Sequence, residues 1–450
     1  MANETVGRAA AAPRKPKLTW LKIESFRNVA PCTLRFGDGF NVLLGLNATG
    51  KTTLLELIAA TLSFDFSKFK EEAFAIEYEL AFSGGTIVAS VRSEREEAPP
   101  VEGTVRPPGM NGIGRGGLNG IGRGGMGAML GMSAELQIRT ALSPNAWTVR
   151  ANMTSVWLED EKPVVFPLLV QLGERGSYLL SWAADLTTDE PIKRAYGEEL
   201  WTWESARRFD EALDVFRGIT GPGTSVEARV HPSTGAALGF NVAGVVPQDL
   251  LLAIGKQVVS MPNGSQGLTI PAESLGFLRE VGALFGFKTS RLEMRLEGKV
   301  GSQIGGMHKF GEFRFMFEDH DGSVIRHEDL SYGQKRLLAF YYYLAASPTT
   351  VIADEIVDGL HHLWIDAAIT AIGDRQAFLA SQNPLLLDHL EFASVEDVAS
   401  TFITCRAERT GDDKHMIWSN LSPYDADRFF RAYQVDVQHV SEILLSKGLW

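Results

Sequence analysis

Residues 45–52 hold the pattern best suited to chemistry in this sequence of 450 residues. They read Gly-Leu-Asn-Ala-Thr-Gly-Lys-Thr, which fits the spacing G-x-x-x-x-G-K-[ST]. The glycines let backbone N–H groups close around phosphates, Lys51 supplies charge to the β- and γ-phosphates, and the Thr52 hydroxyl suits Mg²⁺. A glycine-rich turn without a ligand is the alternative. We expect a phosphate-binding loop made of Gly45, Leu46, Asn47, Ala48, Thr49, Gly50, Lys51, Thr52 and Thr53.

Two carboxylates follow a short apolar run at residues 350–353. This run is typical of a buried strand, and ligands of α/β sheets bind at the carboxyl ends of strands. We therefore expect Asp354 to hold Mg²⁺ together with Thr52, and Glu355 to polarise an attacking water. The alternative is a pair of solvated surface acids, which more rarely terminate a buried strand.

A third segment of interest, Leu-Ser-Tyr-Gly-Gln, covers residues 330–334. Ser331 and Gln334 have the spacing of a capping box, so this segment predicts the start of a helix. By itself the pattern indicates only a well-capped helix. A further apolar run at 376–380 then leads into Ser381 and Gln382, which places another polar pair at a strand end.

Periodicity predicts the elements that must position these residues. Strands are expected at 18–26, 32–36, 40–44, 75–82 and 86–91, with a helix at 51–62 directly after the loop. Helices are expected at 195–216, 248–259 and 271–285, and strands at 290–297 and 312–317 before a turn at Asp321-Gly322. The cluster of acids and His at 318–321 is interpreted as turn chemistry rather than a metal site.

Composition divides the chain further. Residues 96–132 are rich in Gly and contain a tandem octapeptide, beginning at 110 and at 118, that carries Arg115 and Arg123. We interpret this segment as a flexible loop because so much glycine cannot offset its ordering entropy; an Arg-Gly nucleic-acid contact is the alternative. The expected organisation is a disordered tail at 1–17, a first domain part at 18–95, the loop at 96–132, an inserted lobe at 133–287, a second domain part at 288–425 and a C-terminal helix at 426–450.

The charge and the cysteine content restrict the class of protein. With 43 basic and 55 acidic residues the formal charge is −12, which argues against a surface coated for nucleic acid but leaves a local basic groove open. Two cysteines, Cys32 and Cys405, exclude a disulfide framework and suit a reducing cytoplasm. No apolar run has the length of a signal peptide or a membrane span, so we expect a cytoplasmic chain with no membrane partner.

The order of these segments resembles the ABC ATPases. The chain looks like the SMC/RecF/OLD-like group within them, without a coiled coil or a Toprim domain. The features are the phosphate loop, the Leu-Ser-x-Gly-Gln signature, the strand ending in Asp-Glu and the strand ending at a switch residue. Phe26-Arg27, Gly359-Leu360-His361 and the run from Asn383 to Asp388 add to the likeness, which covers 18–95 and 288–425.

The resemblance implies an α/β fold: a P-loop NTPase head of ABC/SMC-like type carrying an inserted mixed α/β lobe. It implies ATP and Mg²⁺ as ligands and a homodimer in which two chains sandwich two ATP molecules. One chain would supply Lys51, Thr52, Asp354 and Glu355; the other would supply Ser331, Gly333 and Gln334. Arg27 would lie near the phosphates by analogy, and the catalytic residues would be Glu355, Gln382 and Lys51.

The sequence departs from the family pattern at two places. Gln382 stands where the family usually has a histidine, and a neutral donor forms a weaker bond to the γ-phosphate than a charged one. We therefore expect slow turnover with binding intact; full substitution of Gln for His is the alternative. In addition, no glutamine occurs between Thr53 and Gln137, so the Q-loop residue is missing or displaced.

The expected role is an ATP-driven switch that gates a partner effector, acting in trans, in DNA maintenance or antiphage defence. Two alternatives stay open: the nucleotide-binding subunit of an ABC transporter, and a nucleotide-gated scaffold that does not hydrolyse ATP. Apolar residues at helical spacing within 434–450 could dock a partner, although packing on the chain's own domain is the expected use.

Overall fold

The computed structural model describes residues 17–449, apart from the gaps 83–84, 96–129, 141–146, 153–154, 159–163, 166–205, 221–224, 231–236, 241–245, 263, 303–304, 411–412 and 436–437. Residues 1–16 of the tail predicted at 1–17, the octapeptide repeat and the first part of the helix expected at 195–216 lie outside the described residues, whereas Lys17 begins a strand.

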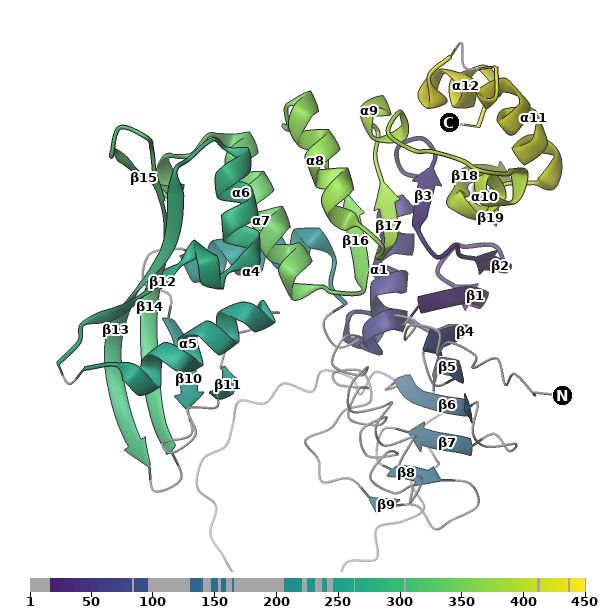
Figure 1. The fold of residues 1–450 in the computed structure, drawn as a ribbon. Coiled ribbons are helices and arrows are strands. Elements are labelled where there is room, and N and C mark those ends of the chain that lie inside the picture. The colour runs from purple at the N-terminus through teal and green to yellow at the C-terminus, as the bar shows by residue number, and fades with distance from the viewer. Residues whose placement is uncertain are drawn as a thin grey trace, which may run out of the picture.

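A mostly parallel sheet lies at the centre of the head (Figure 1). Its order is β16 (Thr350–Asp354), β17 (Gln376–Ala380), β3 (Phe40–Leu44), β18 (Phe402–Thr410) and β19 (Asp413–Asn420), and only β19 runs antiparallel to its neighbour. Near-continuous apolar runs form β16, β17 and β3 because both faces of such strands are buried. Helix α1 (Lys51–Ser63) contacts β16 and β17, so the loop before α1 and the acids after β16 share one edge of the sheet.

An antiparallel sheet extends from the same head. It contains β2 (Cys32–Arg35), β1 (Lys17–Phe26), β4 (Phe74–Phe82), β5 (Gly85–Arg95), β6 (Leu130–Thr140), β7 (Trp147–Asn152), β8 (Ser155–Leu158) and β9 (Val164–Val165), in that order. The buried side chain of Gln376 joins the two sheets, because its amide both accepts from the Leu18 N–H and donates to the Leu18 carbonyl, at 2.9 and 2.8 Å. The boundary expected at 132/133 falls inside β6, so residues 130–140 continue the sheet of the first domain part.

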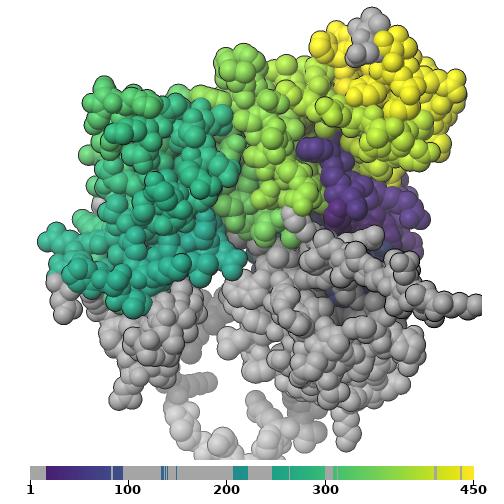
Figure 2. All heavy atoms as spheres, viewed as in Figure 1, coloured from purple at the N-terminus to yellow at the C-terminus, as the bar shows by residue number. Residues whose placement is uncertain are grey.

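Within the described residues, a third sheet and four helices form the second lobe, on the opposite side of the molecule from the C-terminal helices (Figure 2). The sheet contains β11 (Ala237–Phe240), β10 (Ser225–Val230), β14 (Gly305–Glu318), β13 (Thr289–Ser302) and β12 (Gly267–Pro271), with β15 (Val324–Arg326) paired to β14. The helices are α4 (Phe209–Thr220), α5 (Gln248–Ser260), α6 (Gly276–Leu284) and α7 (Tyr332–Ala346). One hydrophobic core includes residues from before and after the boundary expected at 287/288, so the elements on its two sides pack as a unit.

Two of the predicted helices begin later than expected. Residues 206–208 are extended because Arg208 forms a bridge with Ile352 at the edge of β16, and α4 therefore begins at Phe209. Pro271 ends strand β12, whose residues pair with β13, so α6 begins only at Gly276. The turn at Asp321-Gly322 joins β14 to β15 as predicted, with Gly322 at a φ of 85°.

The remaining helices surround the C-terminal edge of the parallel sheet (Figure 1). They are α8 (His362–Ile372), α9 (Pro384–Leu387), α10 (Val395–Thr401), α11 (Pro423–Tyr433) and α12 (Val440–Ser446), so two helices replace the single one expected at 426–450. Val440, Ile443 and Leu444 of α12 are buried in the core beside β3. These three residues therefore pack on the chain's own domain, whereas Val435 and Leu445 are exposed.

Candidate functional site

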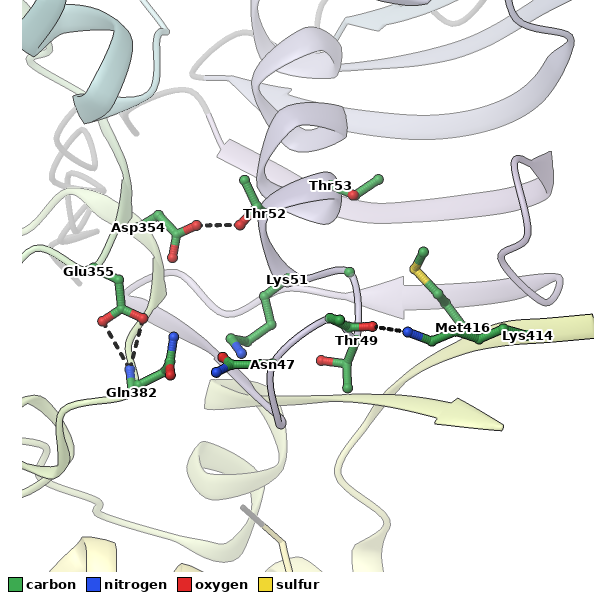
Figure 3. A pocket seen from close by; sticks show the side chains of 12 residues that line it. Asn47, Thr49, Lys51, Thr52, Thr53, Asp354, Glu355, Gln382, Lys414 and Met416 are labelled. Atoms are coloured by element: carbon green, nitrogen blue, oxygen red, sulfur yellow. Dashed lines mark hydrogen bonds between the residues drawn. The ribbon is translucent and has the colours of Figure 1, made fainter. Parts of the chain in front are cut away.

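The phosphate loop connects β3 to α1 and borders a cavity of about 400 Å³ (Figure 3). Seven of the lining residues belong to the loop and the start of α1, and three lie at or just after the ends of β16 and β17. The other two come from β19. Together the lining residues are Asn47, Ala48, Thr49, Gly50, Lys51, Thr52, Thr53, Asp354, Glu355, Gln382, Lys414 and Met416. The structure thus brings together most of the residues that the sequence predicts for one chain's half of a nucleotide site.

Glycines at both ends of the loop are required by its backbone. Gly45 has a φ of 153°, and a Cβ there would lie 2.2 Å from the carbonyl oxygen of Cys405. Gly50 caps α1 at a φ of 87°, and its Cβ would lie 2.3 Å from the Met416 sulfur. Ala48 also has a positive φ, 60°, which costs an L-residue about 1–2 kcal/mol. The backbone of the loop therefore depends on glycine at positions 45 and 50.

Lys51 lies folded across its own loop. Its side chain is 6% exposed, and Nζ donates to the carbonyl oxygens of Gly45 and Leu46 at 2.7 and 3.1 Å. No salt bridge to Lys51 is found within the described part of the chain. A buried ammonium that is bound only to carbonyl groups keeps its charge available for an anion.

Thr52 and Asp354 meet across the cavity. The Thr52 hydroxyl donates to Asp354 Oδ2 at 2.5 Å, which joins the first turn of α1 to the end of β16. A hydroxyl and a carboxylate are oxygen ligands of the kind that Mg²⁺ prefers, and Mg²⁺ usually completes its shell with waters and substrate phosphates. The two residues therefore fit the metal that the sequence predicts, although no cluster of three or more His, Cys, Asp or Glu with metal-binding geometry occurs in the described segments.

Glu355 has a left-handed backbone, with a φ of 49°. Both of its carboxylate oxygens accept from the backbone N–H of Gln382, at 3.1 and 3.0 Å, and Oε2 also accepts from the Ser381 hydroxyl at 3.3 Å. The carboxylate therefore joins the ends of β16 and β17. The left-handed backbone of Glu355 costs on the order of 1–3 kcal/mol, and a conformation of this kind persists only where the surrounding structure holds it.

Arg336 of α7 contacts the strained turn at Glu355. Its guanidinium donates to the carbonyl oxygen of Glu355 at 2.5 Å and stacks on the Phe209 ring, 5.3 Å from the centroid. Helix α7, which begins next to the predicted signature residues, is thus in direct contact with the turn at Glu355. The sequence gives no signal for this role of Arg336.

The signature residues lie apart from the cavity. Ser331 caps α7 as predicted: its hydroxyl accepts from the Gln334 N–H at 3.3 Å, and the Gln334 amide accepts from the Ser331 N–H at 3.0 Å. A Cβ on Gly333 would lie 2.7 Å from the Gly359 carbonyl oxygen, so this position requires glycine. None of Ser331, Gly333 and Gln334 lines the cavity of its own chain.

Arg27 is engaged elsewhere as well. Its guanidinium forms two hydrogen bonds with Glu72, at 2.6 and 2.7 Å, and lies over the rings of Phe26 and Phe69. The bond to Glu72 raises the pKa of Arg27 above its ordinary value. Arg27 does not line the cavity, so the structure does not bring it to the other predicted phosphate ligands.

Sequence reasoning missed two contributions to the site. Lys414 and Met416 reach the loop from β19, which follows the phosphate loop by more than 350 residues and carries no motif. Asp210 lies in the first turn of α4, and the parallel bridge of Arg208 with Ile352 places it level with Asp354. Burial and then the Asp354 charge raise the pKa of Asp210, while Arg208 lowers it. A carboxylate thus stands near Asp354, one of the two residues that the sequence predicts as Mg²⁺ ligands.

The fold and the cavity define a P-loop nucleotide-binding head, with a parallel sheet, a phosphate loop between strand and helix, and acids at the end of a neighbouring strand. Comparison with known proteins agrees with this class. A family described as "AAA domain" matches residues 21–102. The DNA replication and repair protein RecF of Shewanella loihica is 51% identical over 41 residues, and that of Pediococcus pentosaceus is 56% identical over 41 residues. Each match covers 9% of this chain and 11% of the relative's length.

The solved structures to which the chain is similar include SMC heads. One is the SmcHead bound to the C-winged helix domain of ScpA, at 12% identity and a TM-score of 0.37, covering 90% of this chain and 98% of that one. Another is the SMC head domain from Thermotoga maritima, at 11% identity and a TM-score of 0.32, covering 90% and 99%. The chain is thus similar to the AAA domain family over residues 21–102 and to RecF proteins over 41 residues, and its parallel sheet and phosphate loop have the arrangement of a P-loop nucleotide-binding site. No helix of the described segments is long and apolar enough to cross a membrane.

Proposed function

We propose that this chain binds and slowly hydrolyses ATP, and that ATP pairs two copies of it head to tail. The observation that carries the proposal is Lys51, whose buried ammonium faces a cavity lined by loop residues and bonds only to carbonyl groups. The phosphates of ATP would give the Lys51 ammonium a negatively charged partner in place of the carbonyl groups. Thr52 and Asp354 would hold Mg²⁺, which supplies charge neutralisation at the phosphates when bound.

Within this proposal, Glu355 acts as the general base. Its carboxylate lines the cavity and is held by the Gln382 N–H and the Ser381 hydroxyl, both at the end of the adjacent strand. A carboxylate in this place can orient a water and accept its proton. The Gln382 side chain would donate a neutral hydrogen bond to the γ-phosphate, which favours slow turnover.

The pairing of two chains rests on where the signature lies. Ser331 is exposed and Gln334 is partly buried at the capped start of α7, and neither lines the cavity of its own chain. A second chain would therefore be needed to bring a signature to the γ-phosphate. Large apolar side chains are also exposed on the segments that would meet: Leu46 is 75% exposed, Tyr332 62%, Leu363 64% and Leu385 42%. Burying them between two heads would contribute hydrophobic stabilisation.

We further place this ATP cycle in DNA maintenance, with a partner effector that responds to pairing. The support is that the matched relatives are named DNA replication and repair proteins. Partners retained by tagged protein with ATP, but not without it, would be identified by mass spectrometry. Capture of a membrane permease would instead support a transporter subunit.

The direct test of binding is isothermal titration of the wild-type protein, of Lys51→Ala and of Lys256→Met with Mg-ATP. Lys256 is exposed on α5, in the other lobe, so Lys256→Met removes one positive charge far from the cavity. We expect Lys51→Ala to weaken ATP binding at least about tenfold and Lys256→Met to leave it unchanged, since a lost charge-assisted bond is worth ~1.5–3 kcal/mol. Equal affinity of wild type and Lys51→Ala would overturn the proposal.

A further inference from the structure

Strand β19 forms one wall of the phosphate loop. Three residues at alternate positions of this strand contact the loop: Lys414 Nζ donates to the Ala48 carbonyl oxygen at 2.7 Å, and Trp418 Nε1 donates to the Thr49 carbonyl oxygen at 3.1 Å. Between them, Met416 packs against Gly50 so closely that the glycine has no room for a Cβ. One face of β19 therefore contacts the loop from Ala48 to Gly50.

The backbone of residues 28–30 fixes this strand in place. Asn28 Nδ2 donates to the carbonyl oxygen of Lys414 at 2.7 Å, and its own carbonyl oxygen accepts from the Met416 N–H at 2.9 Å. The Ala30 N–H then donates to the Met416 carbonyl oxygen at 2.8 Å. Lys414 and Met416 are thus positioned by main-chain contacts on both sides and do not belong to a loose hairpin end.

The cavity has two chemically different ends (Figure 3). Asp354, Glu355 and Gln382 line one end, and Lys414 and Met416 line the other, with Lys51 between them. If Glu355 acts at the γ-phosphate, the nucleotide must extend from there past Lys51 toward β19. The α-phosphate and the nucleoside would then reach a cation and a thioether.

We infer that Lys414 and Met416 form the nucleoside end of the site, where Lys414 binds the α-phosphate and Met416 packs against the base. This inference rests on the function proposed above. Lys414 would exchange the Ala48 carbonyl for a phosphate oxygen, a stronger partner because both groups are charged. Met416 offers a polarisable sulfur, which makes favourable contacts with aromatic rings.

Lys414 and Lys51 would differ in the phosphate that each binds, the α-phosphate for Lys414 and the β- and γ-phosphates for Lys51. The α-phosphate is present in both ATP and ADP, so loss of the Lys414 charge should weaken the two nucleotides by the same factor. Met416 would contact only the base, so its removal should spare the binding of inorganic tripolyphosphate, which has no nucleoside. The two side chains thus have distinct signatures in a single set of titrations.

The experiment titrates ATP, ADP and tripolyphosphate, each with Mg²⁺, into wild type, Lys414→Met, Lys414→Arg and Met416→Ala, with Lys256→Met as the matched charge control. We expect Lys414→Met to weaken all three ligands about tenfold or more, Lys414→Arg to restore most of this loss, and Lys256→Met to change none. Met416→Ala should weaken ATP and ADP several-fold and leave tripolyphosphate unchanged.

The outcomes separate the two proposals. Wild-type affinity of Lys414→Met for ATP and ADP would overturn the assignment while leaving the proposed function standing. A loss for ATP alone would also overturn it, because the charge would then act on the γ-phosphate. If the wild-type protein itself binds none of the three ligands, the proposed function fails first. Thermal unfolding of each variant is measured alongside, and a loss that Lys414→Arg fails to restore at wild-type stability would count against a role in binding.

Discussion

The contact between Gly50 and strand β19 makes a quantitative prediction for the substitution Gly50→Ala. Gly50 has a φ of 87°, and a Cβ there would lie 2.3 Å from the Met416 sulfur and 2.9 Å from Trp418 Cζ2. The chain offers a matched control in Gly322, which has a φ of 85° but no atom within 4 Å of its Cβ position. An alanine would be strained by its positive φ to a similar degree at both positions, but only at Gly50 would its methyl group meet other atoms.

The expected cost follows from these two terms. An alanine with positive φ costs about 1–2 kcal/mol, and this applies to both positions. Forcing a methyl group into a filled site costs typically about 1–3 kcal/mol, and this applies to Gly50 alone. Gly322→Ala should therefore lower the free energy of unfolding by about 1–2 kcal/mol and Gly50→Ala by about 2–5 kcal/mol.

Urea unfolding, followed by tryptophan fluorescence, measures both variants under the same conditions. A double variant, Gly50→Ala with Met416→Ala, tests the cause: removing the sulfur should relieve the clash, with a coupling of about 1–2 kcal/mol between the two changes. Equal losses for Gly50→Ala and Gly322→Ala, or additive effects of Gly50→Ala and Met416→Ala, would refute the packing of β19 against the loop.

Two further predictions concern turnover and thiol chemistry. Gln382→His should raise the rate of ATP hydrolysis and leave nucleotide affinity similar, because a histidine can donate a charged hydrogen bond; unchanged turnover in a phosphate-release assay would count against the switch role. Burial raises the pKa of Cys32 to about 11 and that of Cys405 to about 12, so little thiolate is present at pH 8. Iodoacetamide should therefore modify both thiols far more slowly in the folded protein than in urea, as followed by mass spectrometry, and rapid modification of the folded chain would contradict the burial.

Much of the candidate site that the phosphate loop and the ends of β16 and β17 form could be predicted from the sequence. Strands at 40–44 and 376–380 have the bounds expected for them, because buried parallel strands read as short apolar runs bounded by turn residues. The capping box at Ser331 and Gln334 is also confirmed, since the capping pattern is local in sequence. These features depend on neighbours within a few residues.

The rest depends on contacts that leave no local pattern. Nothing in the residues around Lys414 indicates that β19 returns to a loop formed near the start of the chain. The pairing of β12 with β13, which joins the second lobe across the boundary expected at 287/288, is equally invisible in periodicity. The hydrogen bonds of the Arg27 guanidinium to Glu72, which lies 45 residues further along the chain, also leave no local pattern.

The most direct test of ATP-dependent pairing is the mass of Glu355→Gln in solution with Mg-ATP, with Mg-ADP and without nucleotide. Glutamine keeps one acceptor for the Gln382 N–H but cannot accept a proton from water, so the account predicts that ATP accumulates between two chains. Light scattering should give twice the chain mass with ATP alone, and Ser331→Arg added to Glu355→Gln should abolish this pairing while ATP still binds. A single-chain mass of Glu355→Gln at saturating ATP would contradict the proposal that ATP pairs two chains.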